Sequence, residues 1–204
     1  MTLTALTLIM IATILVSLNA MNNEELKDRM MFIPYISKND KQSYRIFSHM
    51  FVHADFQHLA FNMMSLYFLG SALEYELIFQ FGFLKGEINF VLLYLLGGLF
   101  STLIPYARNH DNPNYRSLGA SGAVSAVVFA FIIWNPFAEL LIFFAIPMPA
   151  WLFGVLYLAF EIWSDKKGNT GIAHDAHIGG AIFGVIFILI INIEKGKDLL
   201  NLVF

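Results

Sequence analysis

Ser121 lies between glycines at the point where a polar loop gives way to an apolar run that ends at Trp134. The local sequence is Gly119-Ala120-Ser121-Gly122. The first N–H groups of a helix have no partner within that helix, so the Ser121 hydroxyl and these donors would point toward the same small volume. A hydroxyl beside unpaired N–H groups suits a nucleophile and the donors that stabilise an oxyanion.

The same segment also has a purely structural interpretation. Small residues between Gly119 and Ala130 would allow a membrane helix to pack closely against a neighbour. The apolar run from Ala120 to Trp134 covers only ~22 Å as a helix, whereas the hydrocarbon core of a bilayer is ~30 Å thick. If the far end of this run reaches one face of a membrane, Ser121 lies below the other face.

The composition indicates a multi-span membrane protein. Hydrophobic residues make up 58% of the 204-residue chain and charged residues 13%, so we expect one membrane-embedded domain over residues 1–204. The absence of cysteine excludes disulfides, thiolate metal sites and a cysteine nucleophile. A net charge of −3 from sparse acids and bases gives no sign of nucleic-acid binding.

The hydropathy pattern predicts an all-α, polytopic bundle of six transmembrane helices. The predicted spans are residues 3–20, 57–75, 88–106, 120–134, 148–163 and 172–193. The first has no positive n-region or A-x-A site, so we expect a transmembrane helix rather than a cleaved signal. Pro147 and Pro149 interrupt the apolar stretch 137–163, which places residues 137–146 at the membrane interface.

Three connecting segments complete the predicted organisation. Residues 21–56 mix charged and apolar side chains, which favours a structured amphipathic element at the membrane interface. Residues 164–171 form a turn-rich loop, and residues 194–204 form a short tail.

Helix direction places three polar side chains at one depth. The second, fourth and sixth spans run the same way, and Asn62, Ser121 and His177 lie ~20, ~21 and ~24 Å from the opposite face. Taken alone, His177 could be a buried histidine bonded to a neighbouring hydroxyl or carbonyl. At the same depth as Ser121 it favours acyl transfer, in which a histidine takes the serine proton and an amide stabilises the oxyanion.

These residues resemble the signature of the rhomboid intramembrane serine proteases. The resemblance covers about residues 42–190, and the order and spacing of its motifs are more specific than any single motif. The matching positions in chain order are Tyr44-Arg45, His49, His53, His58 with Asn62, Gly70 with Glu74, Gly119-Ala120-Ser121-Gly122, and Ala176-His177-Ile178-Gly179-Gly180 with Gly184.

The resemblance implies a serine endopeptidase that cuts a peptide bond in or near a transmembrane segment through a Ser-His dyad, without cofactor or metal. Ser121 would be the nucleophile and His177 the general base. The oxyanion would be stabilised by His58, Asn62 and the backbone N–H groups of Ser121 and Gly122. The residues expected to shape the site are Gly119, Gly180, Gly184, Arg45 and Glu74.

Two positions depart from the family pattern. Ser125, four residues after Ser121, stands where the family often has an aromatic ring stacked on the base. His177 would then be held by a hydroxyl or by a different ring. Tyr44 replaces the commoner tryptophan before Arg45.

Other polar residues receive less support as site residues. Asp175 is two residues from His177 and is expected on another helix face, and His174, one turn before His177, is expected at the water boundary. The histidines within residues 49–58 show no H-E-x-x-H pattern, so no metal is expected.

Two other functions compete with proteolysis. A rhomboid-like protein that binds transmembrane segments without cutting them would lack Ser121 or His177, and this chain has both. A small transporter would require an internal repeat and a counter-charge within the spans, and neither is predicted.

The resemblance also implies partners and orientation. Transmembrane substrates would enter laterally from the membrane lipid between the second and fifth helices, with residues 164–171 as a lid. The protein would lie in the cell (inner) membrane with its active site opening to the extracytoplasmic side. The positive-inside rule indicates the reverse, because nine Lys and Arg residues lie on the active-site side and three on the other. Five of the nine lie in segment 21–56, whose acids and expected folded structure make it a poor reporter of topology, so the resemblance decides the prediction.

Overall fold

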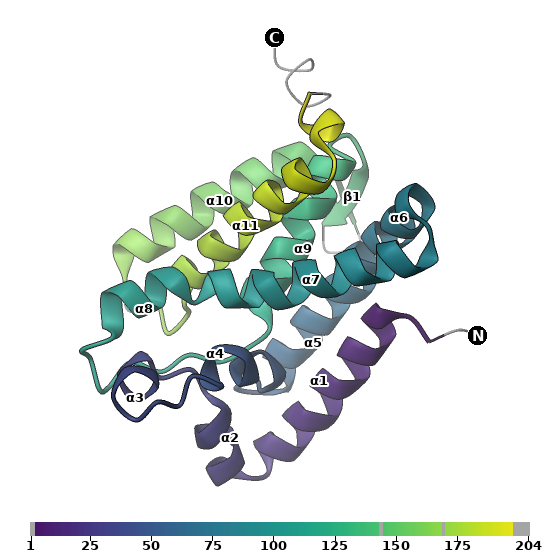
Figure 1. The fold of residues 1–204 in the computed structure, drawn as a ribbon. Coiled ribbons are helices and arrows are strands. Elements are labelled where there is room, and N and C mark those ends of the chain that lie inside the picture. Colours follow the sequence, from purple (N-terminus) through teal and green to yellow (C-terminus); the bar gives the residue numbers. More distant parts are fainter. Residues whose placement is uncertain (1–2, 143–144, 169, 198–204) are drawn as a thin grey trace.

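A computed structural model describes residues 3–142, 145–168 and 170–197, and the described part is predominantly helical (Figure 1). The long helical stretches are α1 (Ala5–Met21), α5 (Phe56–Ser65) continued by the π-helical η2 (Leu66–Gly70) and α6 (Ser71–Phe81), α7 (Phe83–Ser101), α9 (Ser121–Trp134), α10 (Ala150–Lys167) and α11 (His174–Ile191). The short helices are α2 (Glu24–Met30), α3 (Pro34–Asn39), α4 (Arg45–Ser48), η1 (His49–Phe51) and α8 (Leu103–Asn109).

Helices cover most of each of the six predicted spans, so the predicted helical bundle is confirmed in its main features. Two described stretches are long and apolar enough to cross a membrane, namely Phe83–Asn109 and His174–Ile191. The helices Ala5–Met21 and Ser121–Trp134 are apolar but shorter. The number of membrane crossings stays a prediction.

The outer surface of the bundle carries large apolar side chains. Leu15 on α1, Phe79 on α6, Phe160 on α10 and Ile190 on α11 are all exposed. Apolar surface spread over several helices is unfavourable in water and is matched by lipid hydrocarbon. The surface therefore suits a bundle that lies in a membrane.

Residues 137–146 show that the fold is not entirely helical, whereas their placement at the membrane interface stays a prediction. They contain β1 (Glu139–Ile142), which pairs antiparallel with β2 (Ile146–Pro149) before α10 begins at Ala150. Pro147 and Pro149 explain the change because proline disrupts a helix interior but is tolerated in an edge strand.

The segment before α11 also differs from the prediction. α10 continues to Lys167, so the first four residues of the predicted loop 164–171 are helical. Gly168 ends the helix with a φ of 65°, a left-handed conformation that glycine adopts readily. The connection to α11 is therefore shorter than predicted. Of the predicted tail, residues 198–204 lie outside the described residues.

The long segment 21–56 is folded, as predicted, and four short helices account for most of it. α2 shows why such short helices form. Asn23 caps its first turn by accepting the Leu26 N–H, acidic residues lie in its first turn and basic residues in its last. Whether the segment lies at a membrane interface stays a prediction.

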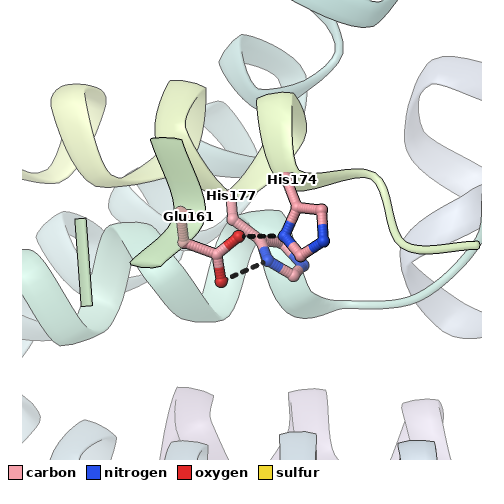
Figure 2. A group of neighbouring side chains, drawn as sticks. All are labelled: Glu161, His174 and His177. Atoms are coloured by element: carbon pink, nitrogen blue, oxygen red, sulfur yellow. Dashed lines mark hydrogen bonds and ion pairs between the residues drawn. The ribbon is translucent and has the colours of Figure 1, made fainter. Parts of the chain in front are cut away.

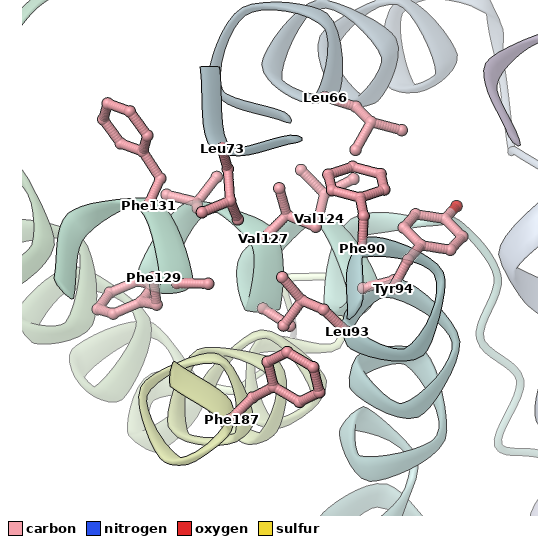
Figure 3. Close-up of a cluster of buried hydrophobic side chains, with 14 of the residues drawn as sticks. Leu66, Leu73, Phe90, Leu93, Tyr94, Val124, Val127, Phe129, Phe131 and Phe187 are labelled. Atoms are coloured by element: carbon pink, nitrogen blue, oxygen red, sulfur yellow. The ribbon is translucent and has the colours of Figure 1, made fainter. Parts of the chain in front are cut away.

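Helix α9 lies at the centre of the bundle, in contact with α5, α6, α7, α10 and α11 (Figure 1). Every residue from Gly122 to Trp134 is buried. A helix that is apolar on all sides has no solvent face and is stable only inside a shell of other helices. Val124, Val127 and Phe129 belong to the apolar cluster that joins α9 to its neighbours (Figure 3).

Glycines bring α9 and α11 close together. A Cβ atom at Gly180 would overlap the carbonyl oxygen of Gly122, and one at Gly184 would overlap the carbonyl oxygen of Ala126. Gly122 itself lies against Ser101 on α7 in the same way. The small residues of the fourth and sixth predicted spans are therefore in contact, and two helix backbones meet there without intervening side chains.

We expect Gly184→Val to destabilise the protein by at least ~1–3 kcal/mol, because the side chain meets rigid backbone rather than a flexible neighbour. The thermal midpoint of the detergent-solubilised protein measures the effect. Ile190→Val, which places the same residue at an exposed position of α11, should leave that midpoint nearly unchanged. Equal midpoints for Gly184→Val and Ile190→Val would contradict this account of the contact.

Candidate active site

Ser121 and His177 meet between the starts of two helices. Ser121 is the first residue of α9, and His177 lies in the first turn of α11. His177 Nε2 and Ser121 Oγ are 2.7 Å apart, within hydrogen-bonding distance. The structure thus brings together the two residues that sequence reasoning selected, and an imidazole in this position can take the serine proton.

The backbone before Ser121 has a conformation that requires glycine. Gly119 has a φ of 118°, and a Cβ atom there would lie 2.6 Å from His58 Cε1. The ring of His58 therefore packs directly against the turn that presents Ser121. The first N–H groups of α9 follow at once and lack intrahelical acceptors, as in any helix start.

The predicted oxyanion residues lie on the same cavity wall. His58 and Asn62 come from α5 and line the cavity that Ser121 and His177 also line. Asn62 Nδ2 donates to the His58 carbonyl oxygen at 2.9 Å, which uses one of its two amide hydrogens. The amide is therefore held by its own helix, and the described residues leave its second hydrogen available to donate.

The cavity has a volume of about 1090 Å³ and is only partly enclosed. Phe61, Ser65 and Leu69 line it from the second helical stretch, and Phe153 and Tyr157 line it from α10. The loop after α10 contributes further lining residues. A cavity of this size, lined in part by Ser121 and His177, has room for a short peptide segment.

Glu161 is a residue of this site that sequence reasoning missed. Its carboxylate lies 3.1 Å from His177 Nδ1 through Oε1 and 2.5 Å from His174 Nδ1 through Oε2 (Figure 2). The signal was available, because Glu161 is a charged residue within the predicted fifth span, and such residues are usually functional. The premise that the spans contain no counter-charge is therefore wrong.

His174 and Asp175, the two polar neighbours of His177 in sequence, contact different partners. His174 is buried because its ring faces Glu161 on α10, and its expected place at the water boundary stays a prediction. Asp175 instead lies 3.3 Å from Arg108 Nη1 and also accepts the Ala176 N–H. Its carboxylate is thus committed away from His177, in keeping with the expected helix face.

Ser125 bonds to a ring hydroxyl rather than to the base. Its Oγ lies 2.8 Å from the Tyr157 hydroxyl. The expectation of a different ring is met in part, because the His174 ring lies edge-on to His177 with the ring centroids 6.1 Å apart. Sequence reasoning did not indicate the second contact, in which the Glu161 carboxylate lies 3.1 Å from His177 Nδ1.

The types of three of these side chains would also suit a metal ion. Glu161, His174 and His177 each offer one ligand atom, and these atoms lie within 4.8 Å of one another. In the described structure the same atoms are joined by the hydrogen bonds above.

Residues 40–193 match the family model of the rhomboid domain, which is more than half of the chain. The chain belongs to the rhomboid family. RHOMBOID-like protein 12, mitochondrial, of Arabidopsis thaliana is 33% identical over 154 residues, covering 72% of this chain and 45% of that protein. Rhomboid protein 1, mitochondrial, of Saccharomyces cerevisiae is 34% identical over 147 residues, covering 67% and 38%. Presenilin-associated rhomboid-like protein, mitochondrial, of Homo sapiens is 30% identical over 142 residues, covering 68% and 35%.

The rhomboid chain therefore spans less than half the length of these relatives. Membership of this family supports a membrane location for the protein.

Two charged residues anchor the first segments of this rhomboid domain. Arg45 is buried and donates through Nη1 to the carbonyl oxygens of Asp28 and Met31 at 2.6 and 2.9 Å. Glu74 is buried on α6 and accepts the Leu6 N–H of α1 at 2.8 Å. Both residues hold backbone rather than substrate, which agrees with the structural role expected from the sequence.

His53 connects the first loop to the serine turn. Its Nε2 accepts the Ala120 N–H at 3.2 Å, so its proton is on Nδ1, which donates to Ser17 Oγ at 2.8 Å. Ser17 Oγ in turn donates to the Phe51 carbonyl oxygen at 2.9 Å. Burial lowers the pKa of His53 to about 3, and burial likewise lowers the pKa of His49 to about 4.

These shifts predict how stability depends on pH. An unfolded histidine takes up a proton near pH 6.5, whereas His53 in the folded protein stays neutral down to about pH 3. The unfolded state therefore gains protons first, and stability falls as the pH drops below about 6.5. We expect the thermal midpoint in detergent to fall between pH 7.5 and pH 5, with a shallower slope in His53→Asn.

The control is Gln80→Asn, an exposed position of α6 that carries no titratable group, and it should keep the slope of the unsubstituted protein. A His53→Asn protein with an unchanged slope would show that the neutral imidazole at this position does not couple stability to pH.

Proposed function

We propose that the protein is an intramembrane serine endopeptidase that hydrolyses a peptide bond in or near transmembrane segments of membrane proteins. The observation that carries the proposal is the 2.7 Å contact between Ser121 Oγ and His177 Nε2 at the wall of a large cavity. The bundle around this pair exposes large apolar side chains, as a protein surrounded by lipid does. We propose that its six long helical stretches all cross the membrane.

The chemistry follows from the positions of the two side chains. Ser121 Oγ attacks the substrate carbonyl carbon while its proton passes to His177 Nε2, which later protonates the leaving amine. The acyl-enzyme is hydrolysed when His177 Nε2 takes a proton from water and the water oxygen attacks the acyl carbon. The bond from that carbon to Ser121 Oγ then breaks, and His177 returns the proton to Oγ. These steps use only side-chain and backbone groups, so no cofactor is required.

We assign the oxyanion to the space between α5 and the start of α9. The backbone N–H groups of Ser121 and Gly122 are at a helix start, where donors are free, and Asn62 and His58 face the same cavity. Donors fixed before reaction begins stabilise the developing charge without reorganisation.

Substrate would enter from lipid between the second helical stretch and α10. The cavity is lined from both of these elements, so a transmembrane segment that bends into it would reach Ser121. Gly168 and Gly171 both have positive φ and lie within the predicted lid, residues 164–171, to which they would give flexibility.

A fluorophosphonate probe tests this assignment directly. We expect the detergent-solubilised protein to become labelled, Ser121→Ala to remain unlabelled, and Ser125→Ala to be labelled like the unsubstituted protein. Ser125 is the matched control because it is one turn further along α9 and bonded to Tyr157. Labelling that persists in Ser121→Ala would exclude Ser121 as nucleophile.

The absence of labelling in the unsubstituted protein would instead favour the second function, a rhomboid-like protein that binds transmembrane segments without cutting them.

For location, we propose the cell membrane, with the site opening to the extracytoplasmic side, although the relatives named above are mitochondrial proteins. A lysine at each end of the bundle can report which side of the membrane that end faces. Lys166 lies at the end of α10 nearest the site, whereas Lys195 donates to the carbonyl oxygen of Trp134, at the far end of α9 from Ser121.

Single cysteines in this cysteine-free chain report the orientation. We expect Lys166→Cys to react with a membrane-impermeant maleimide on intact cells and Lys195→Cys to react only after lysis. The opposite result would show that the positive-inside count is correct, and protection of both until lysis would place the protein in an internal membrane.

A further inference from the structure

We infer that Glu161 is a positioning residue for His177, so that the site works as a serine–histidine–glutamate chain rather than as a dyad. This inference rests on the proposed function and adds a third group to it. The three side chains come from α9, α11 and α10, and their polar atoms form one continuous line of hydrogen bonds.

The first reason is the position of the His177 proton. A carboxylate can only accept hydrogen bonds, so the Nδ1 atom that lies 3.1 Å from Glu161 Oε1 must carry the proton. In the neutral ring, Nε2 is then the acceptor, and it is Nε2 that lies 2.7 Å from Ser121 Oγ. The contact with Glu161 thus selects the tautomer that can take a proton from serine.

The second reason is that the carboxylate is itself fixed in place. His174 Nδ1 lies 2.5 Å from Oε2, the oxygen that does not face His177. His174 and His177 are three residues apart on α11, so they share one face of that helix and hold the carboxylate between them (Figure 2). A carboxylate with both oxygens bonded has little freedom to rotate away from the base.

The third reason is electrostatic. The Glu161 and His174 side chains are only 5% and 4% exposed, so the negative charge is shielded from water. When His177 takes the serine proton it becomes an imidazolium, and a carboxylate 3.1 Å away stabilises that cation strongly in a medium of low dielectric constant. Glu161 stays ionised throughout, and the proton moves only between Ser121 Oγ, His177 Nε2 and the leaving group.

A purely structural role would also place Glu161 here, as a brace between α10 and α11. The two roles predict different results, because a brace needs both histidines equally, whereas a positioning residue acts mainly through its bond to His177. His174→Leu and Glu161→Leu therefore form a matched pair. His174→Leu removes only the hydrogen bond between His174 and Glu161, whereas Glu161→Leu removes the bonds to both histidines.

The experiment measures kcat, KM and the thermal midpoint of these variants with a transmembrane peptide substrate, together with the rate of fluorophosphonate labelling. We expect Glu161→Leu to lower kcat and the labelling rate by about 10²–10⁴-fold with KM within about twofold. Glu161→Gln, whose carbonyl oxygen can still accept from Nδ1 but carries no charge, should fall between Glu161→Leu and the unsubstituted protein. His174→Leu should lose less than Glu161→Leu.

The inference would be overturned if His174→Leu and Glu161→Leu lost kcat equally and in proportion to their loss of thermal midpoint. An unchanged kcat in Glu161→Leu would also overturn it. In either case, labelling of Ser121 in the unsubstituted protein would leave the proposed protease function intact. Loss of activity on dialysis against EDTA, restored by Zn²⁺, would overturn it in favour of a metal site. Failure of the unsubstituted protein to label at Ser121 would overturn both the function and this inference.

Discussion

The close approach of α9 and α11 is the constraint on which the rest of the site depends. Gly180 and Gly184 leave no side chain between α11 and the carbonyl oxygens of α9. A histidine side chain is short, so His177 can reach Ser121 only if the two backbones are this near. The same contact helps to bury α9 in the centre of the bundle. A substitution at these glycines is therefore expected to affect both the stability of the bundle and the distance between Ser121 and His177.

Two groups of polar side chains inside this apolar bundle are organised as bonded chains. One chain runs from Phe51 through Ser17 and His53 to Ala120, and the other from Ser121 through His177 to Glu161. Unpaired polar groups are costly where water is absent, so each bonded partner lowers the cost of the next. The first chain of hydrogen bonds fixes the backbone at Ala120, and the next residue, Ser121, is the proposed nucleophile at the start of the second chain.

Several features were predictable because they depend on local sequence. The position of Ser121 at a helix start and the glycines of α11 follow from residue type and short-range spacing, and the structure places both where expected. The helical character of the spans follows from their apolar length. The hairpin of β1 and β2 was missed, although its prolines marked the end of helical structure, because strand pairing depends on which residues meet across a turn.

The sequence by itself determined the family, the helical bundle and the two residues that meet at 2.7 Å, because each is encoded in contiguous motifs with characteristic spacing. Only the tertiary structure showed that Glu161 lies beside His177 and that His53 accepts the Ala120 N–H. Those contacts join positions 16 and 67 residues apart through the relative rotation and depth of packed helices. Helix rotation is set by how whole faces pack together, and no local pattern of residues records it.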